Sequence, residues 1–220
     1  MFKESLDDFY DILFNYRKGL SRIMQERNIW NGLVVYLFVN LIVMLAIINS
    51  TFILEQDILF SSRLSTLLPP EALTDVLRFM PLANILVQLV FGPLYFLLVV
   101  GVINLAAELF GGQGGASKLG AVVGYGHYPY LIMALGGLFT RYTDFNVIGL
   151  LTFIALLWSL FLKIAGLKIV HEFSWGRAVL IYFMPIIAIM AAIFIFLLLA
   201  IVFLFPLIVQ LTENLQPFFM

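Results

Sequence analysis

Long uncharged apolar runs alternate with short polar segments along the whole chain. A helix of about 20 residues crosses a bilayer core of about 30 Å, and five runs have roughly that length: residues 33–54, 82–107, 119–139, 145–167 and 178–205. Because lipid supplies no hydrogen-bond partners for an open backbone, each run is expected to be helical. The pattern therefore predicts an all-α fold, a polytopic membrane helical bundle with five transmembrane helices.

The segment before the first run has a different pattern. Its apolar residues recur at alternating steps of four and three, as on one stripe of a helix, and they are Phe2, Leu6, Phe9, Leu13, Tyr16, Leu20 and Ile23. The remaining face is charged. We therefore expect an N-terminal amphipathic interfacial helix in the headgroup layer, with contact to a partner helix as the alternative. A second, short amphipathic helix is expected to begin at Pro70, between the first two spans.

Basic residues are distributed unevenly between the two sides of these spans. One side has nine, namely Lys3, Arg17, Lys18, Arg22, Arg27, Lys118, Lys163, Lys168 and Arg177, and the other has three, namely Arg63, Arg78 and Arg141. Because basic segments are retained in the cytoplasm, the N-terminus is expected there and the C-terminus outside. The domains expected are a cytoplasmic amphipathic helix and lead-in (1–30), a five-helix transmembrane domain (31–209) and an extracytoplasmic tail (210–220).

Composition narrows the class of protein further. Hydrophobic residues make up 63% of the chain and charged residues 11%, which is more apolar than a soluble domain. A net charge of -1 leaves no basic surface for nucleic acid. With no cysteine, two histidines and no HExxH pattern, neither a catalytic centre nor a metal site can be assembled. We expect no catalytic residues, no bound metal and no cofactor.

A few polar residues within or beside the runs are candidates for interactions inside the membrane. Asn104 and Glu108 are four residues apart and so share a helix face. Glu108 and Lys163 are expected at similar depths, where they either pair across the bundle or reach the surface separately. His127 lies near the middle of the third run, where a neutral, hydrogen-bonded structural histidine is favoured over a proton carrier.

The most distinctive stretch of the chain is GGQGGASKLGAVVGYGHYPYL at residues 111–131. Its glycines predict a tight turn between two helices, followed by a small-xxx-small face on which helices pack closely in lipid. The candidate turn and packing residues are Gly111, Gly112, Gly120, Gly124, Tyr125 and Pro129. A weak match at an offset of 57 residues also leaves open a parallel repeat of spans two and three in spans four and five.

These features together resemble a known family. The five-span layout, the glycine-rich stretch and WSLFLKIAGLKIVHEFSWGRAVL at 158–180 are similar to the YIP domain family, the Ypt/Rab-interacting membrane proteins. Eukaryotic members of that family bind Rab GTPases through a longer cytosolic region and an acidic-LYGP motif. The sequence GPLY at 92–95 does not reproduce the motif. Rab-type GTPase binding is therefore not expected, and a prokaryotic member in the cytoplasmic membrane is favoured.

The leading functional hypothesis is a non-enzymatic integral membrane scaffold or accessory protein. Such a protein would associate in the bilayer with partner membrane proteins or with further copies of itself, and the resemblance implies a role in trafficking or export. A small-molecule or ion permease is one alternative, to which Asn104, His127 and the repeat point. A membrane-shaping protein, whose N-terminal amphipathic helix would wedge one leaflet, is another.

Overall fold

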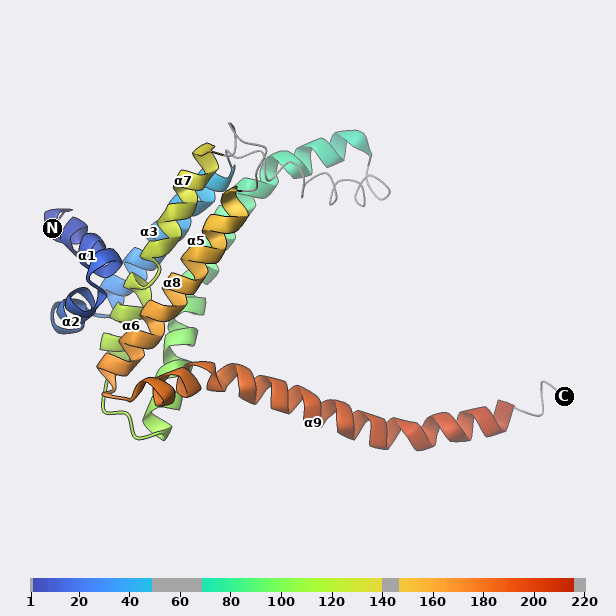
Figure 1. Ribbon diagram of the computed structural model, residues 1–220. Coiled ribbons are helices and arrows are strands. Elements are labelled where there is room, and N and C mark those ends of the chain that lie inside the picture. Colours follow the sequence, from blue (N-terminus) through green and yellow to red (C-terminus); the bar gives the residue numbers. More distant parts are fainter. Residues whose placement is uncertain (1, 49–68, 140–146, 216–220) are drawn as a thin grey trace.

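The fold is helical over the residues that the computed structural model describes, 2–48, 69–139 and 147–215 (Figure 1). In chain order the elements are α1 (Phe2–Phe14), α2 (Tyr16–Glu26), α3 (Ile29–Ile48), α5 (Pro70–Leu109), α6 (Ala116–Tyr125), the 3-10 helix η1 (Tyr128–Tyr130), α7 (Leu131–Phe139), α8 (Val147–Val170) and α9 (Trp175–Leu215). The predicted all-α class is confirmed. Residues 49–54 at the end of the first predicted span lie outside the described residues. Arg63 and Arg141, which were counted for the orientation, lie outside them as well.

Four helices in the described part of the chain are long and apolar enough to cross a membrane. These segments are Ile29–Ala46 in α3, Leu82–Leu109 in α5, Val147–Val170, which is the whole of α8, and Trp175–Pro206 in α9. Each coincides with one of the apolar runs. Length and hydropathy are local properties of the chain, which is why the sequence alone predicts these four helices.

The third predicted run is not one uninterrupted helix. Helix α6 ends at Tyr125, η1 makes a single 3-10 turn, and α7 then begins. Pro129 contributes to the break, because proline has no N–H to donate to the carbonyl four residues earlier. In addition, the N–H of His127 donates to the carbonyl of Gly124, only three residues back. The expectation of a single membrane-length helix over 119–139 is therefore wrong.

The N-terminal amphipathic segment consists of two helices. Helix α1 ends before Asn15, whose backbone is non-helical with φ -139° and ψ 61°, and α2 begins immediately afterwards beside α1 (Figure 1). Helix α2 also contacts α6 and α8, with Leu20 and Ile23 fully buried. The expectation of one continuous helix is wrong, because the chain turns at Asn15. The apolar face of α2 then packs against the chain's own bundle.

The two longest helices differ in how they relate to the rest of the molecule. Helix α5 begins at Pro70, as predicted, but continues to Leu109 without interruption. The expectation of a separate short helix is therefore wrong. Helix α9 leaves the bundle near its start and extends away from it (Figure 1). The hairpins of the suggested repeat therefore differ, since α6 ends at Tyr125 whereas α9 continues past Tyr182.

Helix α6 lies at the centre of the packed core. Every residue from Leu119 to Tyr125 is buried, and α2, α3, α5 and α8 all contact this helix. Non-helical backbone at membrane depth is tolerated where protein surrounds it. The core therefore encloses the break after Tyr125, and the polar side chains near that break come together.

Candidate functional site

His127 lies at the break between α6 and η1 and binds the backbone of its own helix. Its Nδ1 is 2.9 Å from the carbonyl oxygen of Val123, so Nδ1 carries the proton that it donates. Its Nε2 is 3.2 Å from the Nζ atom of Lys163, so Nε2 accepts. We assign the neutral Nδ1–H tautomer, because it satisfies both contacts at once. The imidazole also packs edge-on against Tyr36, with ring centroids 4.8 Å apart.

Lys163 lies against α6 and η1 and has no carboxylate partner among the described residues. Its Nζ lies 5.8 Å from the centroid of the Tyr130 ring, within cation–π range. Its methylene stem passes Gly126, where an added Cβ would meet Lys163 Cγ at 3.1 Å. This close fit of an ammonium group against an aromatic ring and an imidazole fixes the break in the helix from the α8 side.

The sequence allowed a pair between Glu108 and Lys163, and the structure has different partners for each. Glu108 is exposed, and its Oε1 accepts a hydrogen bond from Asn104 Nδ2 at 2.7 Å. The two residues thus share a face of α5, as their spacing predicts. The Glu108–Lys163 pair is corrected to two separate contacts, Asn104–Glu108 on α5 and His127–Lys163 between α6 and α8.

A glycine-to-glycine crossing holds α3 against α6. A Cβ added at Gly124 would overlap the backbone of Gly32, and one added at Gly32 would overlap the backbone of Gly120. The small-xxx-small face predicted on α6 is therefore packed against α3, and Tyr125, directly after it, is buried. Gly32 was missed by the sequence analysis, because a single small residue in an apolar run does not identify the helix that it faces.

A buried charge network, also missed, attaches α2 to α1. Asp8 accepts hydrogen bonds from Nε of Arg22 at 2.9 Å and from Arg27 at 3.0 Å, and Asp11 forms an ion pair with Arg22 at 2.9 Å. Asp8 and Asp11 are 1% and 6% exposed. Their spacing of three residues beside the apolar stripe was the available signal. Without the turn at Asn15, however, nothing in the sequence brings these arginines to them.

The glycine turn between α5 and α6 packs on the turn between α8 and α9. Gly111 has a φ of +79°, which favours glycine. An added Cβ at Gly112 would meet Nδ1 of His171 at 2.5 Å, so only glycine fits there. The backbone N–H of Gly114 donates to the same Nδ1 at 3.1 Å. His171, which the sequence analysis considered only as one of two histidines too few for a metal site, therefore joins the two turns.

Acid is expected to weaken this joint between the turns. Burial lowers the pKa of His171 below its ordinary value of 6.5, and nearby Glu108 partly opposes that shift. A histidine with a lowered folded-state pKa contributes stability that is present above pH 6.5 and lost as the pH falls through the folded-state pKa. We expect the melting temperature in detergent to fall between pH 7.5 and pH 5 by less in His171→Gln than in the unsubstituted protein.

Glu108→Gln provides the matched test of that assignment. Without the carboxylate the pKa of His171 falls further, so the acid-induced loss of stability still begins near pH 6.5 but is expected to continue to lower pH and to be larger in total than in the unsubstituted protein. An unchanged pH profile in His171→Gln would show that other groups cause the acid sensitivity.

The polar contacts in the interior hold helices and turns together. Asp8, His127 and His171 bind backbone groups or other side chains, and among the described residues no three His, Asp or Glu side chains group as a metal site would. The pairs are distributed between the broken helix, the N-terminal hairpin and the two turns, and each pair connects two different segments of the chain. Such an arrangement positions helices.

A helical fold with four membrane-length apolar segments and a polar interior that joins its helices defines an integral membrane protein. The Yip1 domain family model matches residues 10–198. The chain therefore belongs to the Yip1 domain family, which confirms the resemblance found in its sequence. No curated protein matches the chain, and no solved structure does so either.

Proposed function

We propose that this protein is a non-enzymatic membrane scaffold or accessory subunit, which binds partner membrane proteins through the lipid-facing surface of α9. One observation carries the proposal. The segment Trp175–Pro206 is 32 residues long, and its most apolar 18-residue window has a mean hydropathy of 3.3. None of that window is buried within the chain, against 17–28% for the other three candidate spans. The first turns of α9 pack in the core through Ala178 and Ile181, whereas this apolar window adds little to the stability of its own bundle.

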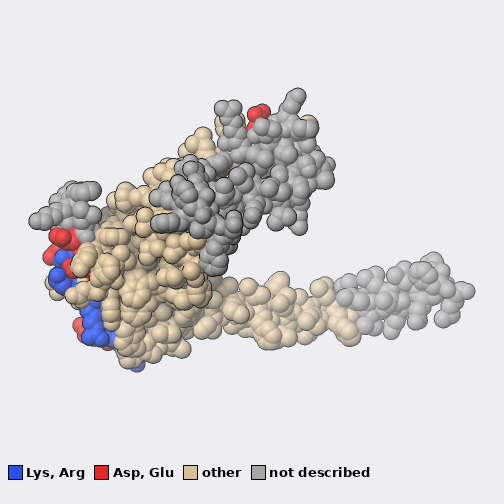
Figure 2. Space-filling view, turned by 45° about the horizontal axis from the view of Figure 1, so that its top comes forward, with Lys and Arg blue, Asp and Glu red and all other residues tan. Residues whose placement is uncertain are grey.

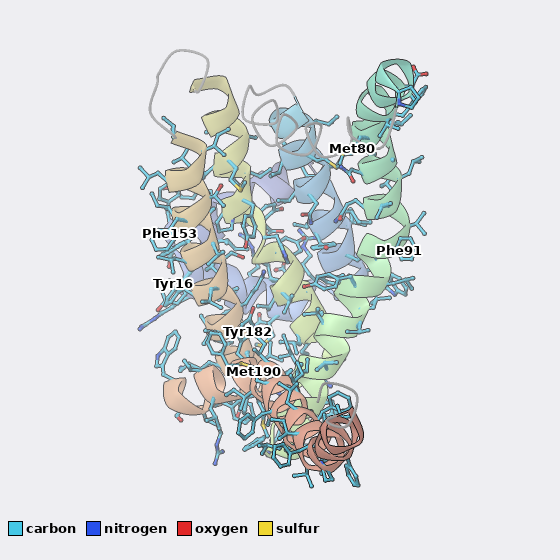
Figure 3. All side chains as sticks on the ribbon, turned by 90° about the vertical axis from the view of Figure 1, so that its right-hand side faces the viewer. Tyr16, Met80, Phe91, Phe153, Tyr182 and Met190 are labelled. Carbon is cyan, nitrogen blue, oxygen red and sulfur yellow. The ribbon has the colours of Figure 1, made fainter. Side chains whose placement is uncertain are left out.

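The other candidate spans each bury part of their apolar window within the chain. Phe91 on α5 and Phe153 on α8 point away from the bundle (Figure 3) and are each 60% exposed, while the opposite faces of both helices contact neighbours. Met190 on α9 is 66% exposed. In lipid, helices associate through shape and small residues, and Ala188 and Ala192 give α9 one small-xxx-small pair. This surface supports packing against helices of another protein.

We further propose that α6, η1 and α7 together make one crossing of the membrane, the third of five. The chain ends then lie on opposite sides, with the N-terminus in the cytoplasm. Figure 2 supports this orientation, because the visible Lys and Arg atoms gather at the edge of the molecule where α1 and α2 lie. Basic residues concentrated at one end of a bundle are typical of its cytoplasmic side.

The permease alternative receives less support. It relied on polar residues within the spans, and these are engaged with neighbours in the chain. Both ring nitrogens of His127 have partners, and Asn104 donates to Glu108. Groups committed to holding helices together are poor candidates for binding a passing solute. The proposed role in trafficking or export is taken from the family. In this proposal, the membrane protein that binds α9 is a component of such a pathway.

Site-specific photocross-linking in the native membrane tests the scaffold proposal. A benzophenone side chain at Phe194, which is 62% exposed, is expected to give a discrete adduct with another membrane protein. The same side chain at Phe91 is the control position on α5. Replacing the residues of 186–205 other than position 194 by leucine keeps the hydropathy but removes the surface, and should abolish the adduct. Adducts with lipid alone, or an adduct that survives the leucine replacement, would contradict the proposal.

A further inference from the structure

A pocket of about 340 Å³ lies where α2, the end of α8 and the start of α9 meet. It is lined by Tyr16, Arg17, Ser21, Ala165, Lys168, Ile169 and Trp175. The lining thus combines two cations, two hydroxyl groups and an indole ring. Lys168 is in the last turn of α8, so the pocket is level with the end of a membrane-length helix, where lipid headgroups lie.

No carboxylate of the described residues neutralises the two cations in this pocket. In the described part of the chain, Arg17 has no carboxylate partner, and its Nε donates to the hydroxyl of Tyr16 at 3.2 Å. Lys168 likewise has none, and its Nζ lies 5.5 Å from the Trp175 ring centroid. By contrast, nearby Arg22 is bound by two buried carboxylates. The pocket therefore offers two uncompensated positive charges, which complement an anion.

An apolar strip on α8 leads from this pocket toward the middle of the helix. Phe161 packs against Tyr16 at 5.0 Å, stacks on Trp175 at 5.7 Å and on Trp158 at 5.3 Å, all between ring centroids. Tyr16 and Phe153 lie on the same side of the bundle (Figure 3). The residues of the strip and the pocket recur at steps of four and three on one face of α8: Ile154, Trp158, Phe161, Ala165 and Lys168.

We propose that this pocket binds the phosphate headgroup of an anionic glycerophospholipid. Arg17 and Lys168 hold the phosphate oxygens, Ser21 supplies a hydroxyl donor, and an acyl chain lies along Phe161 and Trp158. The ligand is a lipid rather than free phosphate, because the cationic pocket continues into an exposed apolar strip at membrane depth. A soluble anion would leave that strip unused. This site includes Trp175 at the start of α9 but none of residues 186–205, so it does not depend on the partner surface proposed there.

Native mass spectrometry of the purified full chain in detergent tests the proposal. With added phosphatidylglycerol, the unsubstituted protein is expected to retain bound lipid, and Arg17→Gln/Lys168→Gln to bind at least about tenfold more weakly, since two charge-assisted contacts are removed. The charge-preserving Arg17→Lys/Lys168→Arg should retain most of the binding. Lys118→Gln, an exposed basic residue outside the pocket, is the control and should bind normally. Arg17 is exposed, so Arg17→Gln alone should fold and show a partial loss.

Three outcomes would overturn the proposal. If Arg17→Gln/Lys168→Gln retained as much phosphatidylglycerol as the unsubstituted protein, the two cations would not hold the lipid. Equal retention of phosphatidylcholine would show that the site does not select an anionic lipid. Displacement of phosphatidylglycerol by millimolar inorganic phosphate, which cannot occupy the apolar strip, would show that the pocket takes free phosphate instead.

Discussion

Asp8→Asn is expected to lower the free energy of unfolding by about 3 kcal/mol, because breaking a buried ion pair leaves its partner charges uncompensated. The Asp8 side chain is 1% exposed and accepts from both Arg22 and Arg27, whose side chains are 24% and 19% exposed. Asparagine keeps the shape of the side chain and removes its charge. The expected result is detachment of α2 from the bundle before the spans unfold, measured by thermal unfolding in detergent and by tryptic cleavage after Lys18.

The control for this prediction is Asp7→Asn. Asp7 precedes Asp8 on the same helix and is exposed, so the substitution makes the same change in net charge without touching the network. Its melting temperature and its rate of cleavage should match those of the unsubstituted protein. If Asp8→Asn behaved like Asp7→Asn, the N-terminal hairpin would be held by its apolar contacts alone, such as those of Leu20 and Ile23.

Much of the fold was predictable because the length and hydropathy of a membrane helix are properties of its local sequence. Runs of about 20 apolar residues predict α3, α5, α8 and α9 whatever surrounds them. Gly120 and Gly124 could also be recognised as a packing face, since their spacing of four places both on one side of a helix. Asn104 and Glu108 were placed on one face for the same reason, and a hydrogen bond joins them.

The remaining features depend on which distant residues meet, and no local pattern encodes that. The apolar stripe of the first 23 residues is continuous in sequence, so it gave no sign of the turn at Asn15. Depth alone suggested Glu108 as a partner for Lys163. The rotation of α8 instead directs Lys163 to His127, and the break after Tyr125 makes that meeting possible. Hydropathy locates a helix in the membrane and leaves its rotation about its own axis undefined.

Gly124→Ala is expected to lower the free energy of unfolding by about 3 kcal/mol, at the upper end of the usual cost of overpacking. The added Cβ would overlap the backbone of Gly32 on α3, and backbone cannot rotate away as a side chain does. Helices α3 and α6 must then separate. Because α6 is buried by four neighbouring helices, that separation disturbs the whole core. The measurement is the melting temperature in detergent, together with the yield of monodisperse protein.

Gly101→Ala on α5 is the matched control, because a Cβ added there has nothing within 4 Å. Alanine exceeds glycine in helix propensity by about 1 kcal/mol, so this variant should be as stable as the unsubstituted protein or slightly more so. The same propensity gain applies at Gly124, which means that any loss of stability there reports steric overlap alone. Equal melting temperatures for Gly124→Ala and Gly101→Ala would show that α3 and α6 do not cross at the Gly32–Gly124 contact.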